Sequence, residues 1–335
     1  LQDRFGPRII ASIGGLLTGI GFILASRFES VSMYLIGFGL LVGSGISFGY
    51  ASATPAALKW FPPEKTGMIA GIVVSGFGLA SVYTAPLAQY LIVFTGVKST
   101  LLILGIAFLI VVVSLSQLLV NPPSHQAPTK VLRNPVATHS DFSAKEVLNT
   151  SPFYLLWLMY VFNAGAGLMV IGKLAKVVSV QAHYEAGFIL VALLAVGNAG
   201  GRLLAGTASD KLGRIRVLKA FTLFQVLLMF LTPYIESAFL LVIFSVCIGL
   251  NYGANLALFP SITKDYFGLK NFGINYGLVF TAWGFGSILA LVAGYIYDRT
   301  KSFEIAFLLA GALLLLSILL SFVIKKPEKK SVAIA

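Results

Sequence analysis

The sequence predicts an all-helical membrane protein. Hydrophobic residues make up 58% of its 335 positions and charged residues only 11%, whereas a soluble domain carries about 25% charged residues. Ten apolar runs recur along the chain, each near the roughly 20 residues that a helix needs to cross a hydrocarbon core about 30 Å thick. The strands of an outer-membrane barrel would instead appear as short segments of alternating hydrophobicity. Helices are therefore the predicted spanning elements.

The predicted spans form a group of four, a polar stretch and a group of six. They are residues 9–26, 31–57, 68–90, 99–120, 152–172, 185–206, 217–235, 238–260, 275–297 and 302–324. Glycines cluster inside these runs, and small residues let membrane helices pack closely. We expect residues 1–120 to form the remainder of an amino-terminal half, 152–324 to form a carboxy-terminal half, and 325–335 to be a basic tail.

Residues 121–151, with four prolines and mixed charge, are predicted to be a cytoplasmic connector between the halves. Within it, Ser143 and Glu146 fit a capping box, in which a serine side chain and a glutamate three residues later satisfy the first amides of a helix. A short helix is therefore expected before the span that opens near Pro152.

The net charge of +12 follows the predicted topology. If the first residues are cytoplasmic, 17 of the 24 Lys and Arg residues lie on the inner side, six lie on the outer side, and Arg202 lies within a span. Such a bias is the positive-inside rule. It places both ends of the chain in the cytoplasm, with the protein in the cell membrane as a multi-pass protein. The basicity is therefore attributed to topology and lipid contact, and no nucleic-acid partner is expected.

A short Asp/Gly/Arg pattern occurs twice, each time directly before an apolar run. Its residues are Asp3, Arg4, Gly6 and Arg8 in the first copy and Asp210, Gly213 and Arg214 in the second. Internal repeats of this kind are typical of secondary transporters, which hold substrate at the repeat interface. Within the carboxy-terminal half two predicted spans precede the second copy, whereas none precedes the first. We therefore expect the chain to lack the first two of twelve spans and to be inactive as it stands.

Every Asp and Glu falls in a loop, at a span edge or in the tail. An intramembrane aspartyl protease or a relay of embedded acids needs carboxylates within the bilayer, and a zinc peptidase needs a His-Glu-x-x-His helix. The sequence has neither feature, so we expect a protein that is not an enzyme and that has no metal and no cofactor.

Arg202 is the strongest candidate for a binding residue because it lies inside a predicted span. Arginine is costly to insert there and usually faces a polar cavity. Asn198 precedes it by one turn and shares its helical face. A guanidinium fork matches a carboxylate through two parallel hydrogen bonds, so the pair is predicted to clamp a carboxylate. The alternative is that Arg202 reaches the cytoplasmic surface or pairs with Asp210.

Five further residues are candidates for the same cavity because of their predicted depth. They are Tyr50, Asn163, Tyr252, Asn255 and Trp283. Each polar one could instead form an ordinary hydrogen bond between helices, and the tryptophan could simply pack. A dry site with one fixed positive charge favours a monovalent anion, because a dicarboxylate would leave a second charge buried without a partner. The predicted partner is thus a small organic anion. Whether protons are a second transported partner stays open.

Several segments together resemble a known family. They are 58–62 (LKWFP), Gly67, 70–71 (AG), 76–78 (GFG), 155–159 (LLWLM) and 166–171 (AGLMVI). With the paired Asp/Gly/Arg pattern, they resemble the oxalate/formate antiporter family and its monocarboxylate transporter relatives within the major facilitator superfamily. The resemblance implies a fold of twelve spans in two halves, of which helices 3 to 12 are present here.

The resemblance also implies that Arg202 binds the substrate carboxylate. Monocarboxylate carriers often have Asp or Asn one turn earlier, as Asn198 is here, whereas oxalate exchangers carry a lysine where this chain has Trp283. The predicted function is transport of a lactate-, pyruvate- or formate-class monocarboxylate by alternating access, through proton symport or anion exchange. Two alternatives stay open: a drug or osmolyte porter of the same superfamily, and a carboxylate sensor that does not transport.

Overall fold

A computed structural model describes residues 5–28, 30–62, 65–122, 141–183 and 187–328. These residues form helices and contain no strand, which confirms the all-helical prediction. The elements are α2 (Pro7–Arg27), α3 (Val31–Tyr34), the π-helix η1 (Leu35–Val42), α4 (Gly43–Leu58), α5 (Thr66–Ser116), α6 (Ala144–Leu148), α7 (Ser151–Gln181), α8 (Gly187–Leu212), α9 (Arg214–Leu231), the 3-10 helix η3 (Thr232–Tyr234), α10 (Ala238–Phe267), α11 (Phe272–Gly286), α12 (Ile288–Thr300) and α13 (Glu304–Val323).

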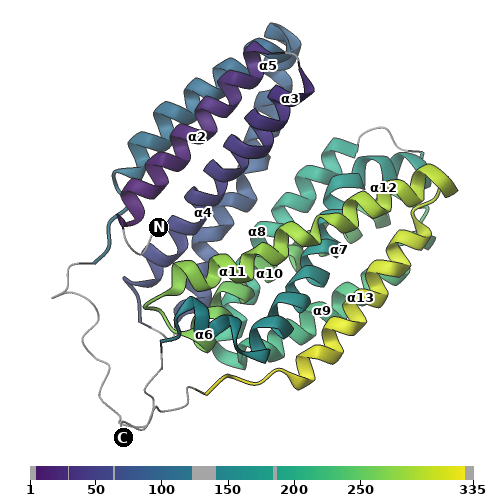
Figure 1. Cartoon of the computed structure of the whole chain (residues 1–335). Coiled ribbons are helices and arrows are strands. Elements are labelled where there is room, and N and C mark those ends of the chain that lie inside the picture. Colours follow the sequence, from purple (N-terminus) through teal and green to yellow (C-terminus); the bar gives the residue numbers. More distant parts are fainter. Residues whose placement is uncertain (1–4, 29, 63–64, 123–140, 184–186, 329–335) are drawn as a thin grey trace, which may run out of the picture. The chain divides into compact units, whose positions relative to one another are not determined.

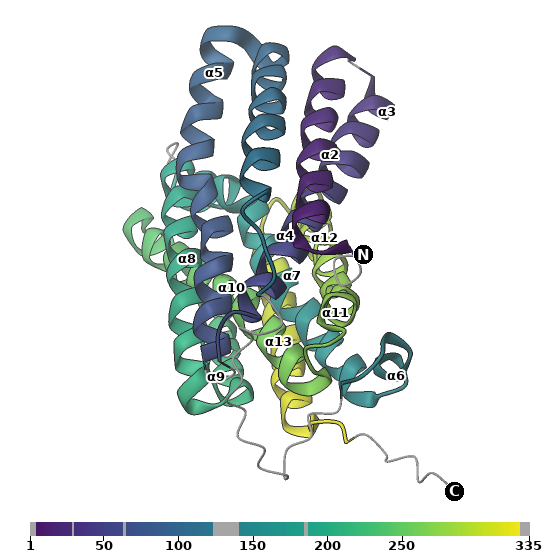
Figure 2. The same cartoon turned by 90° about the vertical axis from the view of Figure 1, so that its left-hand side faces the viewer.

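Nine helical segments of the described chain are long and apolar enough to cross a membrane. One of them, α5, has 51 residues and contains two predicted spans. It is broken at Gly96, whose φ of 75° and ψ of 166° are non-helical and suit a residue without a Cβ. The chain reverses direction along α5 (Figure 2). Dividing α5 at Gly96 gives ten membrane-length segments, as the sequence predicts.

Two predicted helix ends were wrong. Helix α7 continues to Gln181, past the end predicted at 172, and α10 continues to Phe267, past 260. Both extensions carry polar residues, so hydrophobicity alone does not mark where the helices end. The span predicted at 275–297 lies within one membrane-length segment, Phe272–Thr300, which α11 and α12 form with Ser287 between them.

The chain forms two compact units. The first comprises residues 1–63 and 80–134, and the second comprises 64–79 and 135–335. In the first unit α2 packs on α4, where a Cβ at Gly14 would lie 2.7 Å from the Gly45 carbonyl oxygen. Helix α2 also lies beside the second limb of α5 (Figure 1), where a Cβ at Gly19 would lie 2.9 Å from the carbonyl oxygen of Gly105. Glycine–glycine contacts thus set the spacing of this unit.

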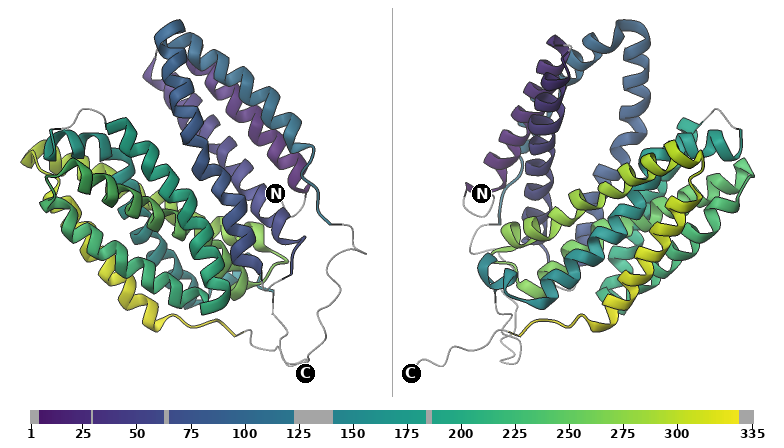
Figure 3. Two further views of the ribbon diagram at one scale, coloured as in Figure 1. Left: turned by 180° about the vertical axis from the view of Figure 1, so that it is seen from behind. Right: turned by 45° about the vertical axis from the view of Figure 1, so that its right-hand side comes forward.

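The second unit contains helices α7 to α13, which lie side by side (Figure 3). Its core is built from buried apolar side chains that include Met169, Leu190, Met229, Leu241 and Phe307. Helices α8 and α10 approach backbone to backbone, and such close approach needs small residues.

The division of the chain differs from the sequence prediction at residues 64–79, which were assigned to the amino-terminal half. In the structure this start of α5 belongs to the second unit. The physical reason is close packing on α8: a Cβ at Gly67 would collide with the Gly206 carbonyl, and one at Gly71 would collide with the Arg202 carbonyl.

The predicted short helix before α7 is confirmed as α6. The Ser143 hydroxyl accepts a hydrogen bond from the Glu146 amide, and the Glu146 carboxylate accepts one of 2.7 Å from the Ser143 amide. This is a complete capping box. Most of the connector, residues 123–140, lies outside the described residues.

Candidate functional site

Arg202 is buried within α8, with 3% of its surface exposed. Its Nε donates a hydrogen bond of 2.9 Å to Oδ1 of Asn198, one turn earlier. Its Nη1 donates to the backbone carbonyl of Val74, in the first limb of α5. The guanidinium is therefore oriented by an amide and a carbonyl inside the second unit and does not extend to the surface.

The α10 turn at residues 252–255 lies beside Asn198. A Cβ at Gly253 would collide with the backbone carbonyl of Asn198 and would lie 2.9 Å from its Oδ1, so only a glycine fits against α8 at this position. Tyr252 directly precedes that glycine and Asn255 follows it by two positions, and they are 6% and 4% exposed. The α10 backbone next to Tyr252 thus lies against Asn198.

Trp283 extends this group to α11. Its indole Nε1 donates a hydrogen bond of 2.8 Å to the Tyr252 hydroxyl, and its ring stacks on Phe280 at a centroid distance of 5.7 Å. Tyr252 also packs on α7, because a Cβ at Gly167 would collide with the tyrosine ring. Helices α7, α8, α10 and α11 therefore converge around Arg202, Asn198 and the Tyr252–Trp283 pair.

Asn163 has the alternative role that the sequence left open, a hydrogen bond between helices. Its amide donates to the Met159 carbonyl at 2.8 Å and to the Ser317 hydroxyl at 2.7 Å. Its Oδ1 accepts from the Thr222 hydroxyl at 2.9 Å. These bonds join α7 to α9 and α13. The remaining candidate, Tyr50, is buried in α4 of the first unit.

The repeated Asp/Gly/Arg pattern has matching backbone geometry where both copies are described. Gly6 and Gly213 each precede a helix, with φ of 83° and 94°, a region that favours glycine. Asp210 was predicted in a loop but lies in the last turn of α8, because Gly213 makes the turn to α9 in one residue. Arg8 is exposed at the start of α2, while Asp3 and Arg4 lie outside the described residues.

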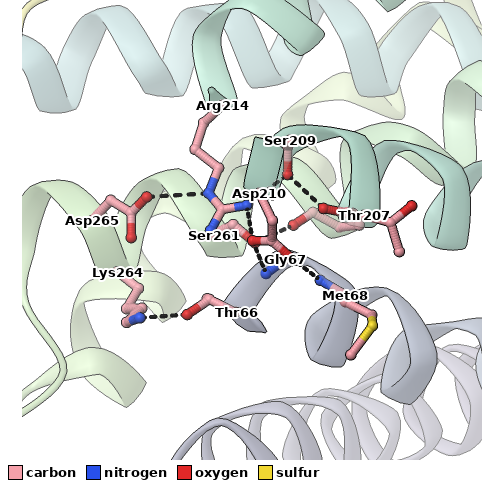
Figure 4. Close-up of polar contacts among 12 residues, drawn as sticks. Thr66, Gly67, Met68, Thr207, Ser209, Asp210, Arg214, Ser261, Lys264 and Asp265 are labelled. Atoms are coloured by element: carbon pink, nitrogen blue, oxygen red, sulfur yellow. Dashed lines mark hydrogen bonds and ion pairs between the residues drawn. The ribbon is translucent and has the colours of Figure 1, made fainter. Parts of the chain in front are cut away.

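Asp210 joins the end of α8 to the start of α5 (Figure 4). Its carboxylate accepts hydrogen bonds from the amides of Gly67 at 2.9 Å and Met68 at 2.8 Å, where the helix dipole favours negative charge. It also pairs with Arg214 at 2.5 Å, and the Arg214 Nε reaches Asp265 at 3.1 Å. Asp210 thus binds Arg214 and the first amides of α5. These contacts argue against the alternative that Asp210 is the partner of Arg202.

A second polar contact holds the same end of α5. The Lys264 ammonium of α10 donates to the Thr66 hydroxyl, close to the Asp210 group (Figure 4). The start of α5 is therefore attached to both α8 and α10 by charged groups.

Sequence reasoning missed three participants: the Val74 carbonyl, Asp265, and the first amides of α5. The Val74 carbonyl and the first amides of α5 are backbone groups, and the residue types in the sequence do not indicate which partners such groups bind. The spacing of Gly67, Gly71 and Gly78 was the available signal, since it forms the ridge of α5 that meets α8.

Ten membrane-length helical segments in the described chain, a glycine-packed bundle and a buried arginine define the class of helical membrane transporters. The model of the Major Facilitator Superfamily matches residues 1–235 and 180–334. The chain belongs to the major facilitator superfamily, and the predicted family is confirmed.

Curated relatives are consistent with the resemblance seen in the sequence. The uncharacterized MFS-type transporter YhjX of Escherichia coli is 29% identical over 86% of this chain and 71% of its own. The oxalate:formate antiporter of Oxalobacter formigenes is 28% identical over 99% of this chain and 80% of its own. Monocarboxylate transporter 13 of Bos taurus is 27% identical over 94% of this chain and 73% of its own.

Solved structures show the same fold. A structure of the fucose:proton symporter FucP of E. coli gives a TM-score of 0.71 at 14% identity and covers 98% of this chain and 86% of its own. A structure of the human organic anion transporter MFSD10 gives a TM-score of 0.71 at 15% identity and covers 96% of this chain and 78% of its own. The protein is therefore a multi-pass membrane transporter by family and fold.

Proposed function

We propose that the protein carries a small monocarboxylate of the lactate, pyruvate or formate class by alternating access, with Arg202 as the carboxylate-binding residue. The observation that carries the proposal is the burial of Arg202 together with its fixation by Asn198, 2.9 Å from Nε. The relatives named for carrying oxalate, formate or monocarboxylates support a carboxylate as the ligand.

The fixation of Arg202 prepares it for a carboxylate. A guanidinium has five donors in a planar fork. Because Asn198 accepts from Nε, it sets the plane of the fork and directs the Nη groups away from α8. Asn198 and the Val74 carbonyl are neutral acceptors, so a bound carboxylate would add an ion pair with two parallel hydrogen bonds, which these oxygens do not supply.

The Tyr252–Trp283 pair supports a small substrate. The indole donates to the tyrosine hydroxyl at 2.8 Å, and the two rings come from different helices. Large amphipathic side chains of this kind exclude water and can also contact the apolar part of a ligand. A second cation would be needed to match a second carboxylate, which favours a monocarboxylate over oxalate.

The Arg202–Val74 hydrogen bond offers a way for substrate binding to change conformation. It joins α8 to α5, the helix whose later part belongs to the other unit. A carboxylate is a stronger acceptor than a peptide carbonyl, so substrate can take over Nη1 and release α5. A ligand shifts a conformational equilibrium only through such a difference between states. The exchange therefore couples occupancy to the rocking of the halves.

The test is equilibrium binding of labelled lactate to the purified chain, challenged with pyruvate, formate and oxalate. Arg202→Gln should abolish binding, Arg202→Lys should weaken it, and Arg216→Gln, at an exposed arginine of α9, should leave it unchanged. Competition by monocarboxylates and not by oxalate would support the substrate class. Binding that survives Arg202→Gln would instead favour a drug or osmolyte porter.

Uptake into proteoliposomes, measured with the chain restored to the twelve spans of the predicted fold, then separates transport from sensing. A carrier should accumulate lactate and lose accumulation in Arg202→Gln. Binding without flux would favour a carboxylate sensor. Imposed proton gradients and internal anions would distinguish proton symport from exchange, and topology labelling would test the cytoplasmic placement of both ends in the cell membrane.

A further inference from the structure

Three lysines lie against the second half of α12, from its midpoint at Gly294 to its end. Lys173 and Lys176 lie on the part of α7 beyond its predicted end, and Lys301 directly follows α12. The Lys173 Nζ would lie 3.1 Å from a Cβ at Gly294. The Lys176 and Lys301 Nζ atoms lie 5.7 Å and 5.9 Å from the centroid of one ring, that of Tyr297. We call Lys173, Lys176 and Lys301 the α12 lysine cluster.

The helix register produces this convergence. Gly165 of α7 packs on Gly286, where a Cβ would lie 2.9 Å from the carbonyl oxygen. The pairs Gly165 and Gly286, Lys173 and Gly294, and Lys176 and Tyr297 have one constant offset of 121 residues (286 − 165 = 294 − 173 = 297 − 176). Helix α7 therefore runs parallel to α11 and α12 and presents both lysines to the same face.

Lys301 is directed to the same ring by its backbone. Its φ of 58° is left-handed, and its amide donates to the Tyr297 carbonyl at 2.8 Å. Non-glycine residues seldom adopt this conformation. Lys301 therefore ends α12 in a way that returns its side chain toward Tyr297.

Tyr297 is the ring that Lys176 and Lys301 have in common. Phe303 stacks on it at 4.5 Å and 15° and covers one of its faces, while the two ammonium groups lie 5.7 Å and 5.9 Å from its centroid. Within the described chain, no acid forms an ion pair with any lysine of the cluster. Like charges that share a small area attract an anion and raise its local concentration.

The cluster lies toward the end of the helices away from Asp210. Helix α7 ends at Gln181 before α8 begins, and α8 then runs back to Asp210 in its last turn. Lys173 follows Gly167, the residue that contacts Tyr252, by six positions, or roughly 9 Å of helix at 1.5 Å per residue. Along α7, the cluster therefore begins about two turns from the contact with Tyr252.

We propose that the α12 lysine cluster is a docking site for small carboxylates, which captures the anion before it reaches Arg202. This inference rests on the proposed function for its choice of ligand. Long lysine side chains at a membrane surface also bind lipid phosphates. A carboxylate is favoured here because the Lys176 and Lys301 ammonium groups lie over the same aromatic ring, so that one small anion can contact both.

The test measures acylation of individual lysines in the purified full chain by an amine reagent, with mass spectrometry as the readout. Lactate should slow acylation of Lys176 and Lys301 several-fold more than chloride does at equal ionic strength. Lys219, which lies alone over the Phe322 ring at 3.6 Å, is the matched control and should show no difference. Equal effects of lactate and chloride would overturn the proposal.

Single variants test whether the cluster acts as one site. In Lys176→Gln, lactate should no longer protect Lys301, and Lys176→Arg should restore protection because it keeps the charge. Lys219→Gln should change neither lysine. Protection of Lys301 that persists in Lys176→Gln would show separate lysines without a common ligand. Protection by phosphatidylglycerol vesicles and not by lactate would assign the cluster to lipid. Either result overturns the proposal.

Arg202→Gln separates the two proposals. Protection of the α12 lysine cluster should persist in this variant while lactate binding at Arg202 is lost. Loss of protection would mean that the cluster merely responds to the central site, against the docking proposal. Unchanged total lactate binding with persistent protection would contradict the role of Arg202 and support the docking site.

Discussion

The Nε of Arg202 and the Oδ1 of Asn198 lie 2.9 Å apart on successive turns of α8. The amide accepts from the guanidinium without neutralising it, so the arginine is oriented and keeps its full positive charge. An aspartate at the same position would also orient the guanidinium, but its negative charge would offset the positive charge of the arginine. The choice of asparagine therefore bears directly on whether this site accepts an anionic ligand.

Asn198→Asp is expected to weaken lactate binding because the new carboxylate competes with the ligand for Arg202. The expected loss is about tenfold to a hundredfold in Kd, corresponding to roughly 1.4 to 3 kcal/mol. Asn198→Ala should weaken it less, since Arg202 loses orientation but keeps its charge. Equilibrium binding with both purified variants measures this, and tighter binding in the aspartate variant would contradict it.

Asp210→Asn is expected to loosen the start of α5 from α8. The change removes a charge that pairs with Arg214 at 2.5 Å and accepts from the amides of Gly67 and Met68. Hydrogen bonds to charged groups contribute about 1.5 to 3 kcal/mol each. Hydrogen exchange of the Gly67 and Met68 amides should accelerate. Lys211→Gln, at the exposed neighbour, is the control, and equal exchange in both variants would contradict the role of Asp210.

Gly201→Ala is expected to destabilise the protein strongly. A Cβ at Gly201 would collide with the backbone of Leu250, whereas a Cβ at Gly200 meets nothing within 4 Å. Overpacking costs typically about 1 to 3 kcal/mol or more, so a thermal melt of the detergent-solubilised chain should fall by several degrees in Gly201→Ala. Gly200→Ala is the matched control and should melt like the parent. Similar melts for both would mean that α8 and α10 can separate without cost.

Asn163→Ala is expected to lower stability without changing lactate binding. It removes the bonds to Ser317 and Thr222 that join three helices, and hydrogen bonds between membrane helices contribute about 0.6 kcal/mol on average and up to about 2. The melting temperature should drop modestly while Kd stays the same. A changed Kd with an unchanged melt would return Asn163 to the substrate cavity.

The sequence predicted the helical class, the ten spans and the capping box at Ser143, because each depends on local hydrophobicity or a local side-chain pattern. It also predicted that Asn198 and Arg202 share a face, which follows from helix periodicity. The extent of α7 was wrong, since Lys173 and Lys176 look like loop residues until their contact with α12 is known. Residues 64–79 belong to the second unit and not to the predicted amino-terminal half, because their glycine contacts with α8 outweigh their position in the chain.

The backbone contact between α8 and α10 has a consequence for how substrate specificity can change. With Gly201 and Gly253 touching the neighbouring main chain, no side chain at these points can be enlarged or trimmed to move one helix against the other. The depth of Arg202 is thereby fixed by two helices at once. If Arg202 binds the substrate as proposed, variation among related carriers would have to act through the residues around a stationary arginine. Replacing Trp283 would then change the substrate more easily than moving the charge.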